Sequence, residues 1–133
     1  MEVMRFSNPV PHGSVSTLDV NAKIGKYQIV AGDVIQVNIT GLHKHPDHWQ
    51  KPEEFRPERF DSGNPLSLAP DGSKRKAMAY CPFLGGKRVC FGKTFAEANL
   101  KLLSIYMAEI FDMAFEEKEK YPDTHNLPMS QVG

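Results

Sequence analysis

The stretch "PFLGGKRVCFGK", Pro82–Lys93, constrains this chain more than any other segment. It sets one cysteine, Cys90, among three glycines, cationic side chains and two phenylalanines, directly ahead of a long apolar segment. Glycine tolerates positive φ and lets other groups approach the backbone closely, so the stretch predicts a tight, irregular loop. The cysteine could serve as a buried packing residue, a reactive nucleophile or a metal ligand.

The chemistry around Cys90 favours a metal-ligating thiolate over a nucleophile. A nucleophilic thiol needs a partnered histidine, and the histidines nearest in the sequence lie far away on either side. A helix beginning near Gly92 would direct unsatisfied N–H groups and its positive dipole end toward a negatively charged sulfur. Arg88, two residues before the cysteine, can pair with a carboxylate on a bound group.

The segment after the loop, "KTFAEANLKLLSIYMAEIFDMAF", predicts a long helix. Glu97 and Lys101 form a favourable i,i+4 pair within it. Its apolar residues spread around most of the circumference, which is typical of a helix inside a larger protein. We therefore expect a buried helix, although the rest of this chain is too small to surround it. The apolar positions are Phe95, Leu100, Leu102, Leu103, Ile105, Tyr106, Ile110 and Phe111.

The sequence ahead of the loop predicts a mixed α+β fold. The start, "MEVMRF", predicts about one helical turn ending before Pro9, because proline disfavours a helical conformation in the preceding residue. Val20–Ile39 predicts β-structure, with "YQIV" and "VIQVNI" on either side of the turn "AGD". The segment "HKHPDHWQKPEEFRPERF" predicts a short helix followed by an irregular, packed meander, and Asp61–Lys76 predicts an exposed loop.

Composition excludes several classes of protein. The 133 residues suit one domain, and 16 basic residues balance 16 acidic ones, so no basic surplus supports nucleic-acid binding. Two cysteines, Cys81 and Cys90, are too few for a disulfide framework and suit a reducing compartment. No apolar run reaches the roughly 20 residues needed to span a bilayer, so we expect no membrane anchor in this chain.

The run "HKHPDH", with His43, His45 and His48, offers a second possible metal site. Two imidazoles separated by one residue can share one side of a strand, and Asp47 could add a ligand. Pro46 and the helical context break that geometry, and no cysteine lies nearby. We therefore favour a packed or solvated polar segment over a metal cluster.

The loop sequence resembles the haem-binding signature of the cytochrome P450 family. "FLGGKRVCFG" matches the pattern F-x-x-G-x-R-x-C-x-G at every fixed position, namely Phe83, Gly86, Arg88, Cys90 and Gly92. Two further family motifs occur in the family's order: "EVMR" matches E-x-x-R, and "PERF" matches the motif that follows it. "GLHKHPDHWQKPEEFRPERF" is also similar to the family, most of all to its microsomal eukaryotic members.

The resemblance implies roles for residues outside the loop. Glu2, Arg5 and Arg59 would form a buried ion-pair network, which specifies how the core assembles more than it adds net stability. The three histidines of "HKHPDH" would be structural. Relatives often carry a basic residue on the strand after E-x-x-R to hold a haem propionate, and "PVPHGSVS" offers His12 at that place.

Within the loop, the resemblance implies a haem site. Cys90 would be the axial thiolate ligand of the iron in haem b, iron protoporphyrin IX. Phe83 would shield the sulfur from water, and Gly86 would shape the loop. Gly92 would allow close approach of the porphyrin, and Arg88 would bind a propionate. The implied activity is that of a haem-thiolate monooxygenase, which inserts one oxygen atom from O2 into an organic substrate.

The implied partners are an NADPH-dependent reductase on the proximal face and a small lipophilic substrate. Lys87 and Lys93 could steer the reductase, or they could be ordinary solvated charges. The family's acid–threonine pair and most of its substrate-contacting segments have no counterpart in this sequence. The resemblance therefore assigns no catalytic residue to this chain.

The resemblance runs from Glu2 to about Phe115, so residues 1–133 would be the C-terminal haem-binding portion of an incomplete family domain. The expected partial fold has a short helix, a small β-hairpin region, a meander, the cysteine loop and the long helix. We expect no normal turnover from the isolated chain. The alternative is a truncated, inactive fragment or an interaction module that binds little or no haem. Full-length relatives reside in the endoplasmic reticulum membrane, and this chain would lie on its cytoplasmic side.

Overall fold

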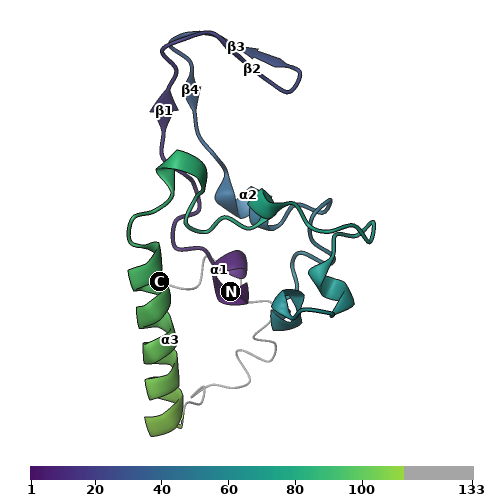
Figure 1. The fold of residues 1–133 in the computed structure, drawn as a ribbon, viewed down its shortest axis with the longest axis vertical. Helices are drawn as coiled ribbons and strands as arrows, with labels where there is room; N and C mark the ends of the chain where they lie inside the picture. Colours follow the sequence, from purple (N-terminus) through teal and green to yellow (C-terminus); the bar gives the residue numbers. More distant parts are fainter. Residues whose placement is uncertain (113–133) are drawn as a thin grey trace, which may run out of the picture.

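The computed structural model describes residues 1–112, and Figure 1 shows how their elements are arranged. Short helices and turns surround a small core, a narrow pair of β-ribbons projects from one end, and one long helix runs along one side. The helices are α1 (Glu2–Phe6), α2 (Ile39–His43) and α3 (Lys93–Ile110), and the strands are β1 (Ser16–Thr17), β2 (Ala22–Ile24), β3 (Tyr27–Ile29) and β4 (Val34–Ile35). Single turns of 3-10 helix are η1 (Pro57–Phe60), η2 (Pro65–Ser67), η3 (Ala77–Ala79) and η4 (Gly86–Arg88).

The strands form two antiparallel pairs. β2 and β3 make a hairpin whose two-residue turn, Gly25 and Lys26, joins the paired residues Ile24 and Tyr27. Gly25 has a φ of +58°, a left-handed conformation that glycine adopts without steric cost. β1 pairs with β4, so the chain leaves the core along β1, turns back through the β2–β3 hairpin and returns along β4.

The predicted β-runs on either side of the turn "AGD" contain β3 and β4, and each of these strands pairs with an earlier strand instead of with the other. The Leu18 N–H donates to the Asp33 carbonyl at 3.0 Å, and the Gly32 N–H donates to the Leu18 carbonyl at 2.8 Å. These bonds hold the chain after β1 beside the turn. The predicted β-run "VIQVNI" is longer than β4, which ends at Ile35. Its last residue, Ile39, begins α2, and the Asn38 side chain caps this helix by accepting a hydrogen bond from the Gly41 N–H at 2.8 Å.

The core lies where α1, α2 and η1 meet. α1 confirms the predicted first helical turn, and it presents both Glu2 and Arg5 to the interior. The predicted meander is also confirmed: Trp49 is fully buried within it, and η1 buries Arg59. The fully or nearly buried apolar residues are Ile39, Trp49, Ala69, Ala79 and Cys81, and the buried polar residues are Glu2, Arg5, Asn8, His43 and Arg59.

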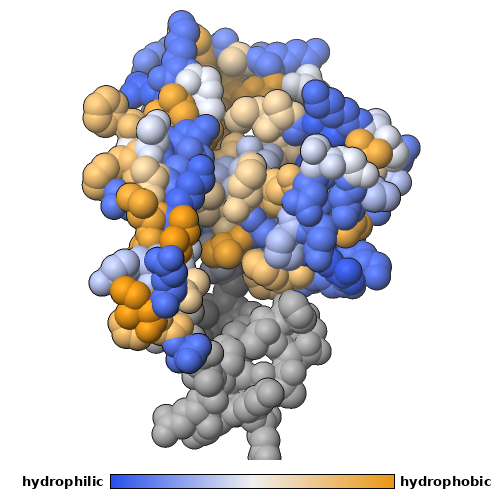
Figure 2. Space-filling view, turned by 60° about the horizontal axis from the view of Figure 1, so that its bottom comes forward, coloured by the Kyte–Doolittle hydropathy of each residue, from blue (hydrophilic) through white to orange (hydrophobic). Residues whose placement is uncertain are grey.

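The predicted long helix is confirmed as α3, but its expected burial is not found within the described residues. None of its side chains is buried, and most of its apolar residues are more than half exposed. Figure 2 shows apolar residues on the outer surface along the left side, where α3 lies in Figure 1. Residues 113–115 of the predicted helix lie outside the described part of the chain. The core is too small to cover a helix that is apolar on most sides.

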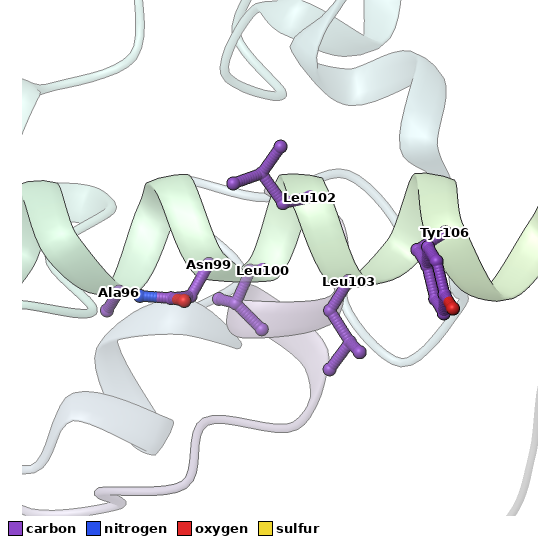
Figure 3. A pocket seen from close by; sticks show the side chains of 6 residues that line it. All are labelled: Ala96, Asn99, Leu100, Leu102, Leu103 and Tyr106. Carbon is purple, nitrogen blue, oxygen red and sulfur yellow. The ribbon is translucent and has the colours of Figure 1, made fainter.

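An open apolar hollow lies against α3. It has a volume of about 660 Å³. Figure 3 shows that Leu102 extends on one side of the helix and the other lining side chains on the opposite side. The lining residues are Ala96, Asn99, Leu100, Leu102, Leu103 and Tyr106. This helix therefore offers apolar surface in more than one direction.

Candidate cofactor-binding site

The loop that carries the cysteine is closed by backbone hydrogen bonds. The Cys90 N–H donates to the Phe83 carbonyl at 2.9 Å, which brings two fixed positions of the motif together. Gly86 has a φ of +65°, and its carbonyl accepts a hydrogen bond from the Val89 N–H at 3.3 Å. A side chain at Gly86 would be strained in this left-handed conformation, so the glycine shapes the turn as predicted.

The Cys90 thiol stands exposed at the end of this loop. The Lys93 N–H donates to the Cys90 carbonyl at 3.3 Å, so α3 begins directly after the cysteine. A Cβ added at Gly92 would lie 3.9 Å from the Cys90 Sγ, and apart from the adjoining residues it would meet no other atom within 4 Å. The space beside the sulfur is therefore open to a bulky or flat group, and a side chain at position 92 would intrude on it.

The remaining predicted loop residues lie around this thiol. Phe83 is partly buried, whereas Arg88 and Lys87 on η4 and Lys93 at the start of α3 are exposed. The exposed side chain of Arg88 can be reached by an anionic group that approaches the loop.

The segment before β1 passes close to the loop. A Cβ added at Gly13 would lie 3.1 Å from the Leu84 Cδ2 and 3.3 Å from the Val37 Cβ, so glycine permits this close approach. Its neighbour His12 is exposed and forms an isolated β-bridge with Asn38. The structure thus places the predicted histidine on a segment that packs against the loop.

Glu2, Arg5 and Arg59 form the predicted network. Arg5 donates from Nε to Glu2 Oε2 at 2.8 Å and from Nη2 to Glu2 Oε1 at 2.6 Å, a bidentate pair. Arg59 Nε lies 3.3 Å from the same Oε1, which also accepts the Arg56 N–H at 2.9 Å. Burial, followed by the Arg5 charge, lowers the pKa of Arg59, while Glu2 opposes this shift. One carboxylate thus compensates two buried guanidinium groups.

The two buried arginines also bind the meander backbone. Their remaining N–H groups donate to carbonyl oxygens, so few of their donors are left unsatisfied. Arg5 donates to the carbonyls of His43, Pro52 and Glu54, and Arg59 donates to those of Gln50, Lys51 and Glu54. The network therefore fixes the path of the irregular segment that separates α2 from η1.

Known proteins resemble this chain over most of its length. A family model for cytochrome P450 matches residues 1–132. The chain belongs to the cytochrome P450 family. Human cytochrome P450 2U1 is 34% identical over 122 residues, which are 92% of this chain and 21% of that protein. The retinoic acid-bound cyanobacterial CYP120A1 structure has a TM-score of 0.71 and 30% identity, covering 81% of this chain and 24% of that one. A mutant cytochrome P450DA heme domain has a TM-score of 0.70 and 32% identity, covering 85% and 24%.

Cytochromes P450 are haem monooxygenases, so family membership implies a haem cofactor. This chain spans about a fifth of the length of the curated relatives that it matches first. Through residues 1–112, no helix is both long and apolar enough to cross a membrane.

The histidines of the run "HKHPDH" lie in different environments. His43 is fully buried, while His45 is exposed and its ring lies 5.5 Å from that of His48. Within the described part of the chain, no group of three or more His, Cys, Asp or Glu side chains could hold a metal ion. The three histidines are thus divided between the core and the surface.

Sequence reasoning missed an aromatic and cationic cluster around Trp49. The Arg75 guanidinium carbon lies 3.9 Å from the Trp49 ring centroid, and the Arg75 side chain donates to the carbonyls of His48 and Leu66. Arg75 lies in a segment predicted to be an exposed loop, and only its position in the basic run "SKRK" hinted at another charge contact. The pKa of Arg75 is lowered, and burial is the largest cause of this shift.

Sequence reasoning also missed Tyr80. Burial raises the pKa of its hydroxyl to about 12, so the side chain stays neutral at physiological pH.

Proposed function

We propose that this chain is the haem-ligating portion of a haem-thiolate monooxygenase, with Cys90 as the axial ligand. One observation carries the proposal: the Cys90 thiol is exposed at the end of a backbone-tethered loop, with open space beside it at Gly92. A buried packing cysteine would be enclosed, as Cys81 is. The exposed thiol of Cys90 is accessible to a group from outside the chain.

The loop residues fit haem b, iron protoporphyrin IX. Phe83 lies at the root of the cysteine loop and would shield the sulfur, and Gly86 gives the loop its turn. Gly92 leaves room for a flat macrocycle, and the cations Arg88 and His12 would meet its propionates. Amide groups at the start of α3 favour negative charge on the sulfur.

Haem held by a thiolate supplies the capacity to activate O2 and insert one oxygen atom into a C–H bond. This chain's part is to hold the sulfur in place and to limit its exposure to water. The Cys90 N–H and carbonyl are both engaged, with Phe83 and Lys93 respectively, so the backbone on either side of the thiol is fixed. Such preorganisation keeps a ligand in one geometry.

The partners follow from the same surface. We propose that Lys87 and Lys93, exposed on either side of the cysteine, face an NADPH-dependent reductase, for which steering is the expected benefit. A small lipophilic substrate is supported by the retinoic acid bound to the related CYP120A1. Contact with such a reductase would place this part of the molecule on the cytoplasmic side of a membrane.

The isolated 133-residue chain is a second case, for which we propose no normal turnover. The observation that favours this is α3, because none of its side chains is buried by the described residues and the thiol stands beside uncovered apolar surface. A chain in this state would bind haem weakly or act as an interaction module. The proposed inactivity applies to the isolated 133-residue chain, whereas the haem-thiolate role applies to the site around Cys90.

Haem reconstitution tests both proposals. We would express the chain with haem, reduce it, add carbon monoxide and record the Soret band. A thiolate-type red shift that disappears in Cys90→Ala and persists in Cys81→Ala supports ligation by Cys90. The absence of haem uptake in the wild-type chain would remove the cofactor role from this chain. Product formation with an added reductase would contradict the proposed inactivity.

A further inference from the structure

His43 joins the buried core to the root of the Cys90 loop. Its carbonyl accepts a hydrogen bond from Arg5 Nη1 at 3.0 Å, which connects it to the Glu2 network. Its ring Nε2 accepts a hydrogen bond from the Cys81 N–H at 3.0 Å, although 38 residues separate the two. The ring also stacks on Tyr80, with centroids 5.3 Å apart and an interplanar angle of 23°. The fully buried His43 therefore contacts both the Glu2 network and the root of the Cys90 loop.

The Cys81 hydrogen bond requires one chemical state of His43. A backbone N–H can only donate, so Nε2 must carry a lone pair, and the proton of the neutral ring lies on Nδ1. Burial, followed by the Arg5 charge, lowers the pKa of His43 to about 4, while the backbone of Met4 and Arg5 opposes this. At neutral pH the ring is therefore uncharged and able to accept.

The root of the loop depends on this bond. The Cys81 carbonyl accepts a hydrogen bond from the Leu84 N–H at 2.9 Å, which closes a turn over residues 81–84. This turn contains Phe83, whose carbonyl accepts the hydrogen bond from the Cys90 N–H. Leu84 has a φ of +60°, a left-handed conformation that is uncommon for leucine. Surrounding contacts must hold such a turn, because the residue would otherwise relax. The hydrogen bond from the Cys81 N–H to His43 Nε2 holds Cys81, the first residue of this turn, against the core.

We propose that His43 is a positioning residue: its Nε2 anchors Cys81 and thereby sets the Cys90 loop against the Glu2–Arg5–Arg59 core. The anchoring is a property of the polypeptide, and its importance for haem rests on the function proposed above. A purely space-filling role is the alternative. That alternative predicts that any flat ring of similar size at position 43 would serve equally well.

Three variants separate anchoring from space filling. His43→Phe keeps a ring that can stack on Tyr80 but leaves the Cys81 N–H without an acceptor. His43→Gln loses the ring, but its side-chain oxygen can take the place of Nε2. Tyr80→Leu removes the stacking partner and leaves the acceptor intact, so it serves as the matched control.

The measurement is thiol labelling of the full haem-free chain in a Cys90→Ser background, where Cys81 is the remaining cysteine. Cys81 is buried, so its labelling rate reports opening of the loop root. Loss of the acceptor strands a buried donor, and we expect His43→Phe to label about ten- to a hundredfold faster. His43→Gln should stay within roughly threefold of the parent, and Tyr80→Leu should lie closer to the parent than to His43→Phe. The acceleration should be independent of urea at low concentration, which identifies local opening.

Equal labelling of His43→Phe and the parent would overturn the proposal, and so would equally fast labelling of His43→Phe and His43→Gln. If circular dichroism shows that His43→Phe is unfolded, His43→Gln decides: parental protection supports the anchor and lost protection overturns it. A carbon monoxide spectrum of the wild-type chain is recorded separately. Its failure would count against the haem proposal, while the labelling result would still decide the role of His43.

Discussion

Arg59 Nε lies 3.3 Å from Glu2 Oε1, although 57 residues separate them in the chain. The same carboxylate binds Arg5 with both of its oxygen atoms, and all three side chains are almost completely buried. A buried charge that loses its partner is far more costly than a pair replaced as a whole. The first helix therefore holds the meander, and through it the base of the cysteine loop.

Removing the charge of Glu2 should destabilise the chain strongly. Glu2→Gln keeps the side-chain volume but leaves Arg5 and Arg59 without a compensating carboxylate. We expect the free energy of unfolding to fall by about 3–5 kcal/mol in urea titration. The matched control is Glu53→Gln, which breaks an ion pair to Lys44 in which the glutamate side chain is 71% exposed. That change should cost less than about 1 kcal/mol, and a similar loss in both variants would contradict the network.

His43 predicts a pH dependence of stability. Its pKa is about 4 in the folded chain and about 6.5 in the unfolded chain. Above pH 6.5 neither state binds the proton; as the pH falls toward 4, only the unfolded state does. The free energy of unfolding should therefore drop by roughly 3 kcal/mol between pH 6.5 and pH 4.

This contribution is measured by urea titration at several pH values. His43→Gln should abolish this part of the slope, whereas His45→Gln, at an exposed position, should leave it unchanged. A slope that persists undiminished in His43→Gln would show that other groups titrate in this window. Glu54 and Asp71 have lowered pKa values, so their contributions to the free energy of unfolding also fall as the pH falls. These losses begin at a lower pH than the loss due to His43, because the ordinary pKa of a carboxyl group is lower than that of histidine.

Because the apolar face of α3 is exposed, we expect polar substitutions of its leucines to have little effect on the stability of this chain. Leu103→Gln should change the free energy of unfolding of this chain by no more than about 0.5 kcal/mol, since the side chain is exposed. Ile39→Ala is the control, because Ile39 is fully buried and its truncation should cost about 2–5 kcal/mol. Urea titration of both variants checks the contrast. A large loss in Leu103→Gln would mean that this face is covered in solution.

Arg88 predicts a specific effect on haem affinity. Arg88→Gln should weaken haem binding by roughly tenfold, if its guanidinium pairs with a propionate as proposed. Lys87→Gln removes the same charge from the neighbouring exposed position, and it should leave the affinity within about twofold. Haem titration followed by absorbance compares the two. Equal weakening would indicate a general effect of positive charge instead of a defined contact.

Local sequence determined the chemistry and the short elements of this protein. Proline at position 9, the fixed residues of "FLGGKRVCFG" and the helical pattern after Gly92 act over a few residues, so the first turn, the cysteine loop and α3 were predictable. The family motifs "EVMR" and "PERF" predicted the members of the Glu2 network. Periodicity also identified β-structure, since alternation is a local property.

Only the tertiary structure decided which distant segments meet. Strand partners depend on contacts between β1 and the turn near Asp33, which no local pattern encodes, so only the structure shows that β1 pairs with β4. The bond from Cys81 to His43 and the contact of Arg75 with Trp49 join segments 38 and 26 residues apart. Burial likewise depends on what surrounds a helix. The sequence pattern of α3 shows that it is apolar, and only the fold shows that residues 1–112 leave it uncovered.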